Sequence, residues 1–229
     1  MVTKILFLIL TILTYVIAKK VNQKIPGLLF SPVIITPVVL IGFLLISNIP
    51  YQTYADSALP LNYMLDIVTV ALAVPLYRNW EFIKTNWRVI LTSLAAGSFI
   101  AVIAGATTAI WLAFSDAYIL SLLPRIVTIP IAVNLSESIG GLPTLTVLFS
   151  MTTCFVGVFI GPHILKHFSI KNPLSIGMVY GLGAQALGTA KAFEMGDKQG
   201  TTSSVSYILT AIFTVIWALL LTPVLKLFM

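Results

Sequence analysis

The chain has 229 residues, of which 59% are hydrophobic and only 9% are charged, and its net charge is +6. Soluble domains usually carry about 25% charged residues. This composition therefore excludes a soluble globular protein, a disordered chain and a secreted disulfide scaffold. A helical membrane protein with several crossings remains. Its loops are too short to hold a soluble catalytic or nucleic-acid-binding domain.

Apolar segments follow one another along the whole chain, separated by short loops. The first resembles the apolar part of a signal peptide, but it has no small-x-small cleavage site and runs into Lys19, Lys20 and Lys24, so we expect it to be retained as a membrane helix. The sequence predicts an all-α polytopic membrane protein with about seven spanning helices and a broken or re-entrant segment. The apolar segments are 2–18, 28–47, 61–77, 89–114, 117–139, 142–165, 174–190 and 203–228.

Basic residues gather in particular loops. Loops 19–27 and 78–88 carry an excess of Lys and Arg and are expected inside the cytoplasm, with loop 48–60 outside. If segment 117–139 crosses fully, the two lysines of loop 166–173 fall outside; if it enters and returns, they fall inside. Its prolines and glycines favour the re-entrant path, because irregular backbone at membrane depth persists only where protein buries it or water lines it.

A weak internal repeat relates the two halves of the chain. Residues 90–92 and 208–210 share the sequence Ile-Leu-Thr, and the topology above runs the later copy in the opposite direction. We interpret residues 1–115 and 116–229 as the two inverted membrane repeats of a single integral membrane domain. Chance matches in apolar sequence are the alternative. Inverted repeats with interrupted segments are typical of alternating-access transporters.

The densest polar cluster within an apolar segment is residues 123–143. Arg125 cannot be deprotonated and can grip a carboxylate through two parallel bonds, and a helix break near Pro130 exposes backbone groups. A helix starting near Ser136 would point free N–H groups at an anion. A surface loop is the alternative, but polar groups in a membrane are costly, so we interpret the cluster as a substrate site. Its candidate binding residues are Arg125, Thr128, Pro130, Asn134, Ser136 and Glu137, and its candidate hinges are Pro124, Gly140 and Gly141.

A second cluster combines glycines with polar side chains. Gln185 and Thr189 are four residues apart and share a helix face, so with Gly188 they are candidates to bind a small solute. Close helix packing is the alternative role for the glycines. Asp66 and Glu137 are candidates to carry a coupled proton, although Asp66 at the outer interface in water is an equal alternative.

The sequence contains no motif for a metal site, a disulfide or an enzyme active site. His163 and His167 share a helix face, but no Cys or carboxylate lies close by in sequence to complete a metal site. Cys154 is the only cysteine, so no intrachain disulfide forms. No nucleophile–base pair, Walker loop or dinucleotide fingerprint is present. We therefore expect no enzyme, no metal, no cofactor and no nucleic-acid partner.

Four stretches carry a resemblance to one family that covers essentially the whole chain: Pro75–Arg78, Leu123–Ala132, Ser136–Gly141 and Ala186–Ala192. They resemble the LrgB/CidB family of bacterial membrane proteins, and residues 193–195 are more similar to its CidB branch. Three positions depart from the family pattern: Gln185 stands where many relatives carry His, and Ile126 and Ile129 replace more polar residues.

The resemblance implies a multi-pass protein of the bacterial plasma membrane that works with a small LrgA/CidA-type membrane partner; we also expect a homo-oligomer. The family is associated with holin-like and antiholin-like control of murein hydrolase activity and cell lysis. Related proteins are implicated in moving pyruvate, glycolate or glycerate. Our leading hypothesis is a secondary transporter or facilitator of small monocarboxylate anions. The alternatives are a holin-like pore or lysis regulator, and a scaffold for the smaller partner.

Overall fold

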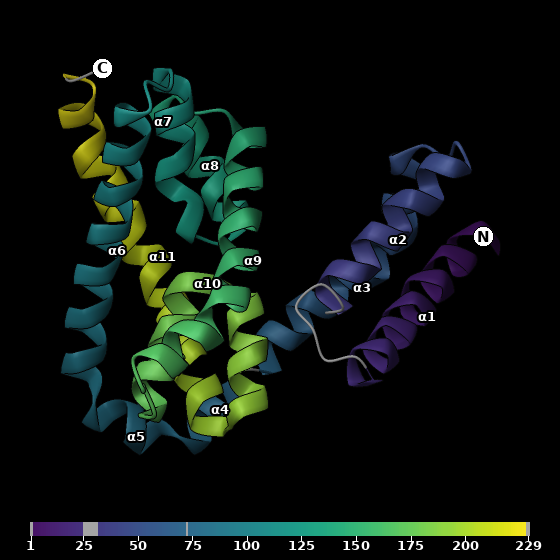
Figure 1. Ribbon diagram of the computed structural model, residues 1–229, viewed down its shortest axis with the longest axis horizontal. Helices are drawn as coiled ribbons and strands as arrows, with labels where there is room; N and C mark the ends of the chain where they lie inside the picture. Colours follow the sequence, from purple (N-terminus) through teal and green to yellow (C-terminus); the bar gives the residue numbers. More distant parts are fainter. Residues whose placement is uncertain (1, 25–31, 72, 228–229) are drawn as a thin grey trace. The chain divides into compact units, whose positions relative to one another are not determined.

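The computed structural model describes residues 2–24, 32–71 and 73–227, and in those ranges it contains helices and no strand. The predicted all-α class is confirmed (Figure 1). The chain forms two compact units, Met1–Ala71 and Leu72–Met229, which we call unit 1 and unit 2.

Unit 1 contains α1 (Val2–Lys24), α2 (Pro32–Ile46) and α3 (Tyr51–Ala71), with α1 packed against the other two. The hydroxyls of Thr11 and Tyr54 lie 3.1 Å apart, and the ring of Phe7 meets that of Tyr54 edge to face. Most other apolar side chains of α1 are exposed, including Ile9 and Leu13. An extended apolar surface of this kind suits a membrane.

Unit 2 is framed by three long helices, and two short ones precede them. Among the described residues, four helices are long and apolar enough to cross a membrane: α6, α9 and α11 here, and α1 in unit 1. The predicted count of about seven crossings therefore depends on shorter helices as well. The bounds are α4 (Ala73–Arg78), α5 (Trp80–Thr85), α6 (Trp87–Trp111), α9 (Pro143–His167) and α11 (Asp197–Leu225).

Residues 116–139 form the broken, re-entrant segment that the sequence predicts, and we call it hairpin 1. It consists of α7 (Asp116–Leu122), the short 3-10 helix η1 (Leu123–Ile126) and α8 (Ile129–Ile139), with extended backbone at residues 127 and 128. Leu120 and Leu123 of the inward arm share one buried cluster with Leu135 and Ile139 of α8. The two arms therefore lie side by side, and the chain leaves on the side where it entered.

Residues 173–195, which form α10 (Pro173–Met195), also turn back, and we call them hairpin 2. The backbone of Gln185 is not helical, with φ 50° and ψ −131°. Residues eight apart in a straight helix are separated by about 12 Å, yet Gly188 packs directly against the carbonyl of Tyr180. Ile176 and Ala192 share a buried cluster with Tyr180. Where the sequence predicts one apolar segment, 174–190, the structure shows two arms, 173–184 and 186–195.

The tips of the two hairpins meet inside unit 2. The amide of Gln185 donates a hydrogen bond from Nε2 to the carbonyl of Arg125, at 3.1 Å. Arg125 in turn bonds the carbonyl of Ala101, near the middle of α6, and Val127 shares a buried cluster with Ala211, near the middle of α11. Hairpin 1 connects the end of α6 to the start of α9, and hairpin 2 follows the end of α9. The hairpins therefore enter from opposite ends and meet at mid-depth (Figure 1).

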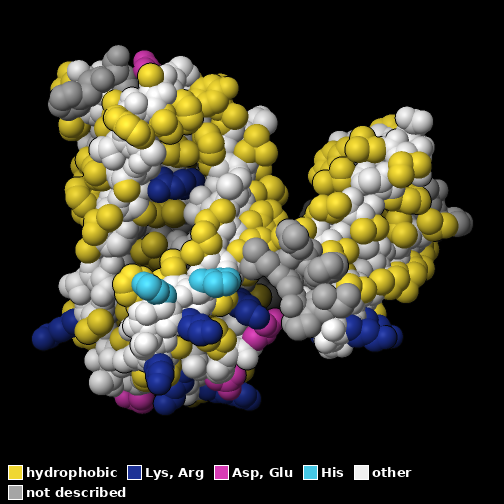
Figure 2. Space-filling view, viewed as in Figure 1, with side chains coloured by type: hydrophobic (Ala, Val, Ile, Leu, Met, Phe, Trp, Pro, Cys, Tyr) yellow, Lys and Arg dark blue, Asp and Glu magenta, His cyan; other side chains and the backbone are white. Residues whose placement is uncertain are grey.

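Basic side chains gather at the end of unit 2 from which hairpin 2 enters (Figure 2). By the positive-inside rule this end faces the cytoplasm. Loop 166–173 lies at this end, as expected for a re-entrant hairpin 1. The basic residues of this end are Arg78, Lys84, Arg88, Lys166, Lys171, Lys191 and Lys198.

Candidate functional site

Arg125 lies in η1, one turn before the tip of hairpin 1. The buried Pro124 starts this turn, whose last bond runs from the Val127 N–H to the Pro124 carbonyl at 3.0 Å. The half-buried guanidinium reaches across to α6, where Nη2 donates to the Ala101 carbonyl at 2.7 Å. It lies directly against Gly105, where any larger side chain would overlap it. The lack of a side chain on α6 at this position thus makes room for the cation.

Among the described residues, no carboxylate lies within 4 Å of the Arg125 guanidinium. The salt bridge found in those residues joins Lys191 to Glu194, at the basic end of unit 2. A guanidinium has five N–H donors, and carbonyls accept from two of its nitrogens here. Figure 2 shows a basic side chain recessed among apolar ones, away from the basic end of unit 2. An uncompensated cation at membrane depth is costly, and a bound anion would offset that cost.

Gln185 and Thr189 complete a hydrogen-bonded chain that begins at Arg125. Gln185 is 4% exposed, and Thr189 donates from Oγ1 to the Gln185 carbonyl at 3.0 Å. The Thr189 hydroxyl also lies 2.9 Å from the hydroxyl of Ser203 on α11. A positive φ at a residue with a side chain costs about 1–3 kcal/mol. These bonds to Arg125 and through Thr189 to Ser203 hold Gln185 in that conformation.

Two helices start at this depth, one after each tip. α8 begins at Ile129 with Thr128 as its N-cap and Pro130 in its first turn. The second arm of hairpin 2 begins after Gln185 and carries Gly188 and Thr189 in its first turns. The first N–H groups of a helix have no partner within the helix and carry partial positive charge. Two helix starts and one guanidinium together favour an anion.

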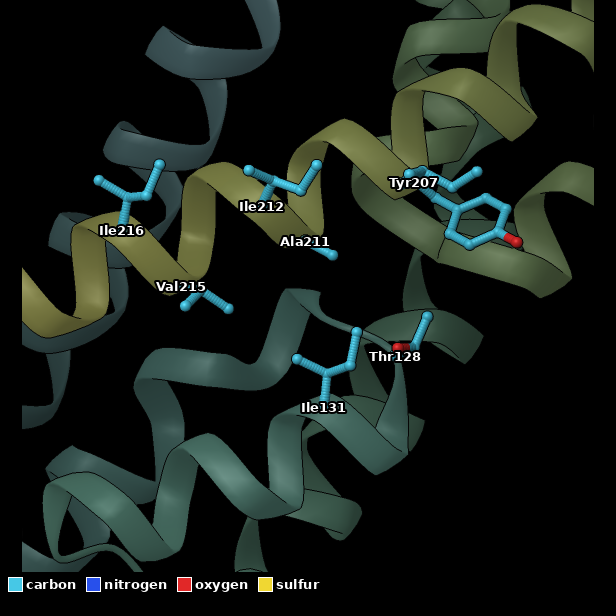
Figure 3. A pocket seen from close by; sticks show the side chains of 8 residues that line it. Thr128, Ile131, Tyr207, Ala211, Ile212, Val215 and Ile216 are labelled. Carbon is cyan, nitrogen blue, oxygen red and sulfur yellow. The ribbon is translucent and has the colours of Figure 1, made fainter.

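A groove of about 370 Å³ opens beside the tip of hairpin 1, between α8 and α11 (Figure 3). Thr128 and Tyr207 supply hydroxyls at one end, and the remaining lining is aliphatic, with Ile131 facing Val215. Ile212 on its rim is about half exposed. An apolar groove at membrane depth suits hydrocarbon chains better than a carboxylate, and Arg125 is not among the residues that line it.

Three candidates on α8 are not brought to Arg125. Ser136 is fully buried, and its hydroxyl lies 2.7 Å from the Thr146 hydroxyl, which in turn lies 2.9 Å from the Ser121 carbonyl. This network ties the base of hairpin 1 to α9. Asn134 and Glu137 are exposed on α8.

The two candidate hinge glycines, Gly140 and Gly141, lie at the end of α8, at the base of hairpin 1. Gly140 ends α8 in the left-handed conformation, with φ 96°, a conformation that favours glycine. Gly141 packs against the backbone of Ser121. The side chain of Asp66 lies outside the described part of the structure, so its proton-coupling role, like that of Glu137, stays a prediction.

Sequence reasoning missed the partners that surround the site. Ala101 and Gly105 carry no functional group, so no motif marks them. Ser203 could have been found from the sequence, because it lies in a run that is unusually polar for a membrane helix, Gly200-Thr201-Thr202-Ser203-Ser204. Among the described residues, no group of three or more His, Cys, Asp and Glu is placed to hold a metal.

These features define an all-α, multi-pass membrane protein in which two discontinuous segments meet at mid-depth. The chain belongs to the LrgB-like family, whose model matches residues 11–224. A protein of Bacillus subtilis (strain 168), named as uncharacterized protein YwbG, is 45% identical over 210 residues, covering 92% of this chain and 93% of its own.

Two staphylococcal relatives carry the name holin-like protein CidB. The one from Staphylococcus aureus (strain N315) is 35% identical over 213 residues, covering 93% of each chain. The one from Staphylococcus epidermidis (strain ATCC 12228 / FDA PCI 1200) is 34% identical over 210 residues, covering 92% of each chain. No solved structure matches the chain. The predicted family, its CidB-like character and the location in a bacterial membrane are confirmed.

Proposed function

We propose that this protein moves small monocarboxylate anions, of the pyruvate, glycolate or glycerate type, across the bacterial plasma membrane as a secondary transporter or facilitator. The observation that carries the proposal is Arg125, a cation without an acidic partner among the described residues, held where two opposed hairpin tips meet. Transporter sites commonly lie at the midplane between discontinuous helices, with helix starts pointing at the anionic group.

Each residue of the meeting point has a role in this proposal. Arg125 grips the carboxylate through two of its N–H groups. Gln185 and Thr189 offer an amide and a hydroxyl to the rest of a small acid, and the first turn after Thr128 offers backbone N–H groups. Since each hairpin closes the route from its own end, small movements of the tips would open the site to one side at a time.

The proposal extends to partners and coupling. A small LrgA/CidA-type membrane protein would assemble with this chain, and the chain would form homo-oligomers. Asp66 or Glu137 would take up a proton if movement of the anion is coupled to one. The family membership of the chain supports the LrgA/CidA-type partner.

A second candidate function is a holin-like pore, or a regulator of murein hydrolase activity and lysis. The name of the two staphylococcal relatives, holin-like protein CidB, favours it and supports it more directly than it supports transport. A holin forms an oligomeric, unselective hole. Such a hole has no evident need for an arginine fixed between two re-entrant tips, and selectivity therefore separates the two functions.

The deciding experiment is uptake of labelled pyruvate into liposomes that contain the purified protein and a trapped dye, with and without the smaller partner. For a carrier we expect saturable uptake with the dye retained. Linear, unselective entry together with loss of the dye would instead establish a pore and remove the assigned site.

Within that assay, Arg125→Gln tests the site directly. Hydrogen bonds to charged groups contribute about 1.5–3 kcal/mol, so we expect uptake at low pyruvate to fall at least about tenfold while the amount of folded protein is unchanged. Arg88→Gln is the matched control, because Arg88 is exposed at the basic end and lies over the Trp87 ring. Unchanged uptake in Arg125→Gln would contradict the assignment.

A further inference from the structure

A stripe of hydroxyl side chains runs along one face of α11 at four-residue spacing. Thr202, Ser206, Thr210 and Thr214 are all fully buried. Thr202 and Thr214 each donate to the carbonyl four residues earlier, at 2.8 and 2.7 Å. Ser206 and Thr210, between them, have no hydrogen-bond partner among the described residues. Buried hydroxyls are nearly always satisfied, so these two need an explanation.

The stripe is in register with the first arm of hairpin 2. Gly177 packs against Thr202, and four residues further along both helices Gly181 packs against Ser206. One more step of four along α11 reaches Thr210, and four residues beyond Gly181 the helix of the first arm has ended, at Gln185. The two unpartnered hydroxyls therefore lie beside the last turn of the first arm, where its helix ends.

That last turn supplies further oxygen atoms. The final carbonyls of a helix have no partner within the helix and carry partial negative charge. The first arm ends before Gln185, so its last turn, from Gly181 to Ala184, supplies such carbonyls next to Ser206. Neutral hydroxyl and carbonyl oxygens thus gather at one buried place with no carboxylate on either segment there.

We infer that Ser206, Thr210 and the end carbonyls of the first arm bind a sodium ion. Hard cations take oxygen ligands, and a set without a carboxylate matches a single charge better than a divalent one. Gly181 packs closely against Ser206, so no side chain of the first arm separates its backbone from this hydroxyl-bearing residue. The ends of half-helices and unwound carbonyls are known to hold sodium in transporters built from broken helices.

The role of this ion rests on the proposed function, because sodium at the tip of hairpin 2 would link the anion's movement to the sodium gradient. Gln185 connects the two places, since it ends the first arm and bonds the carbonyl of Arg125. Occupation of the ion site would fix the tip of hairpin 2 and with it the position of Gln185 beside the anion.

Sodium binding is measured without transport, by thermal unfolding of the purified full chain in detergent followed through tryptophan fluorescence. Sodium chloride is titrated against choline chloride at constant ionic strength, with potassium chloride as a further series. A ligand that binds only the folded state raises the melting temperature, and for a chain of this size we expect a saturating rise of about 4 °C.

Ser206→Ala and Thr210→Val should each abolish that rise. Thr214→Val is the matched control and should keep it, because the Thr214 hydroxyl lies on the same stripe but is already bonded to the Thr210 carbonyl. Ser206→Ala removes a single oxygen atom, so it keeps the test valid even if Thr210→Val does not fold.

Three results would overturn the site: no sodium-dependent rise in the wild type, a rise retained in both variants, or an equal rise with potassium. A sodium response that is normal in the wild type and lost in both variants, in a protein that moves no monocarboxylate, would leave the ion site standing and remove the proposed transport.

Discussion

Hairpin 1 and hairpin 2 reach the same depth from opposite ends of unit 2, but their breaks have different causes. Prolines flank the break in hairpin 1, at Pro124 and Pro130, and neither can donate a backbone hydrogen bond. Hairpin 2 contains no proline after Pro173. Its reversal at Gln185 depends on a strained backbone conformation that its surroundings hold in place.

The arms of the two hairpins are also joined differently. At the base of hairpin 1, the hydroxyls of Ser136 and Thr146 connect it to α9. The arms of both hairpins contact each other, but hairpin 1 does so through apolar side chains such as Leu123 and Leu135, whereas in hairpin 2 Gly188 lies against the backbone carbonyl of Tyr180. The comparison teaches that local chemistry dictates one break and tertiary packing the other. Changes in packing should therefore affect hairpin 2 more strongly.

The largest effect is expected for Gly188→Ala. A Cβ atom there would overlap the Tyr180 backbone, which cannot yield without separating the arms. Overpacking of this kind costs about 3 kcal/mol, so the melting temperature should fall by about 9 °C, as measured by tryptophan fluorescence. The control is Gly183→Ala, whose added Cβ meets nothing within 4 Å. Equal melting temperatures for the two variants would break the comparison.

A smaller loss is expected in hairpin 1 for Thr146→Val. This change removes the hydroxyl that contacts Ser136 and the Ser121 carbonyl, and it leaves those buried groups without that partner. The free energy of unfolding should fall by about 2 kcal/mol, measured by denaturation in mixed detergent. Thr152→Val is the matched control on α9, because its hydroxyl is exposed and bonds only its own helix. A loss in the control as large as in Thr146→Val would show that the network contributes nothing of its own.

The smallest expected effect is the difference in stability between two variants at the tip of hairpin 2. Both Gln185→Ala and Gln185→Gly lose the bond to the Arg125 carbonyl, but glycine adopts a φ of 50° without the strain of a side chain. The glycine variant should therefore be more stable than the alanine variant by about 1 kcal/mol. Parallel thermal melts measure the order; an alanine variant at least as stable would mean that Gln185 is not strained.

Much of the site could be predicted from the sequence where local chemistry decides it. The broken path of residues 117–139 followed from its prolines and glycines, and Arg125 stood out because a cation is rare in an apolar segment. Gln185 and Thr189 were chosen for sharing a helix face, and the structure does place both near the tip, although Gln185 itself breaks the helix. Nothing local marked that break, because it is made by the packing of Gly188 against Tyr180.

For the candidate residues on α8, the sequence was a poor guide to which side chains reach Arg125. Ser136 has the right chemistry for an anion site, but its position in the fold turns it to Thr146 on α9. Asn134 and Glu137 lie on the exposed side of the same helix. Which face of a short helix meets the site depends on how the hairpin packs, and a polar residue in the sequence carries no information on that.

By itself the sequence determined the membrane class, the order of the apolar segments, the basic cytoplasmic end and the presence of one cation inside a broken segment. These follow from composition, hydropathy and proline chemistry, which act within a few residues. Only the tertiary structure decided that residues 173–195 also turn back, that the two tips meet at Arg125 and Gln185, and that Ser206 and Thr210 face the end of a half-helix. Those features depend on close approaches between segments distant in the chain, which arise from the packing of whole helices.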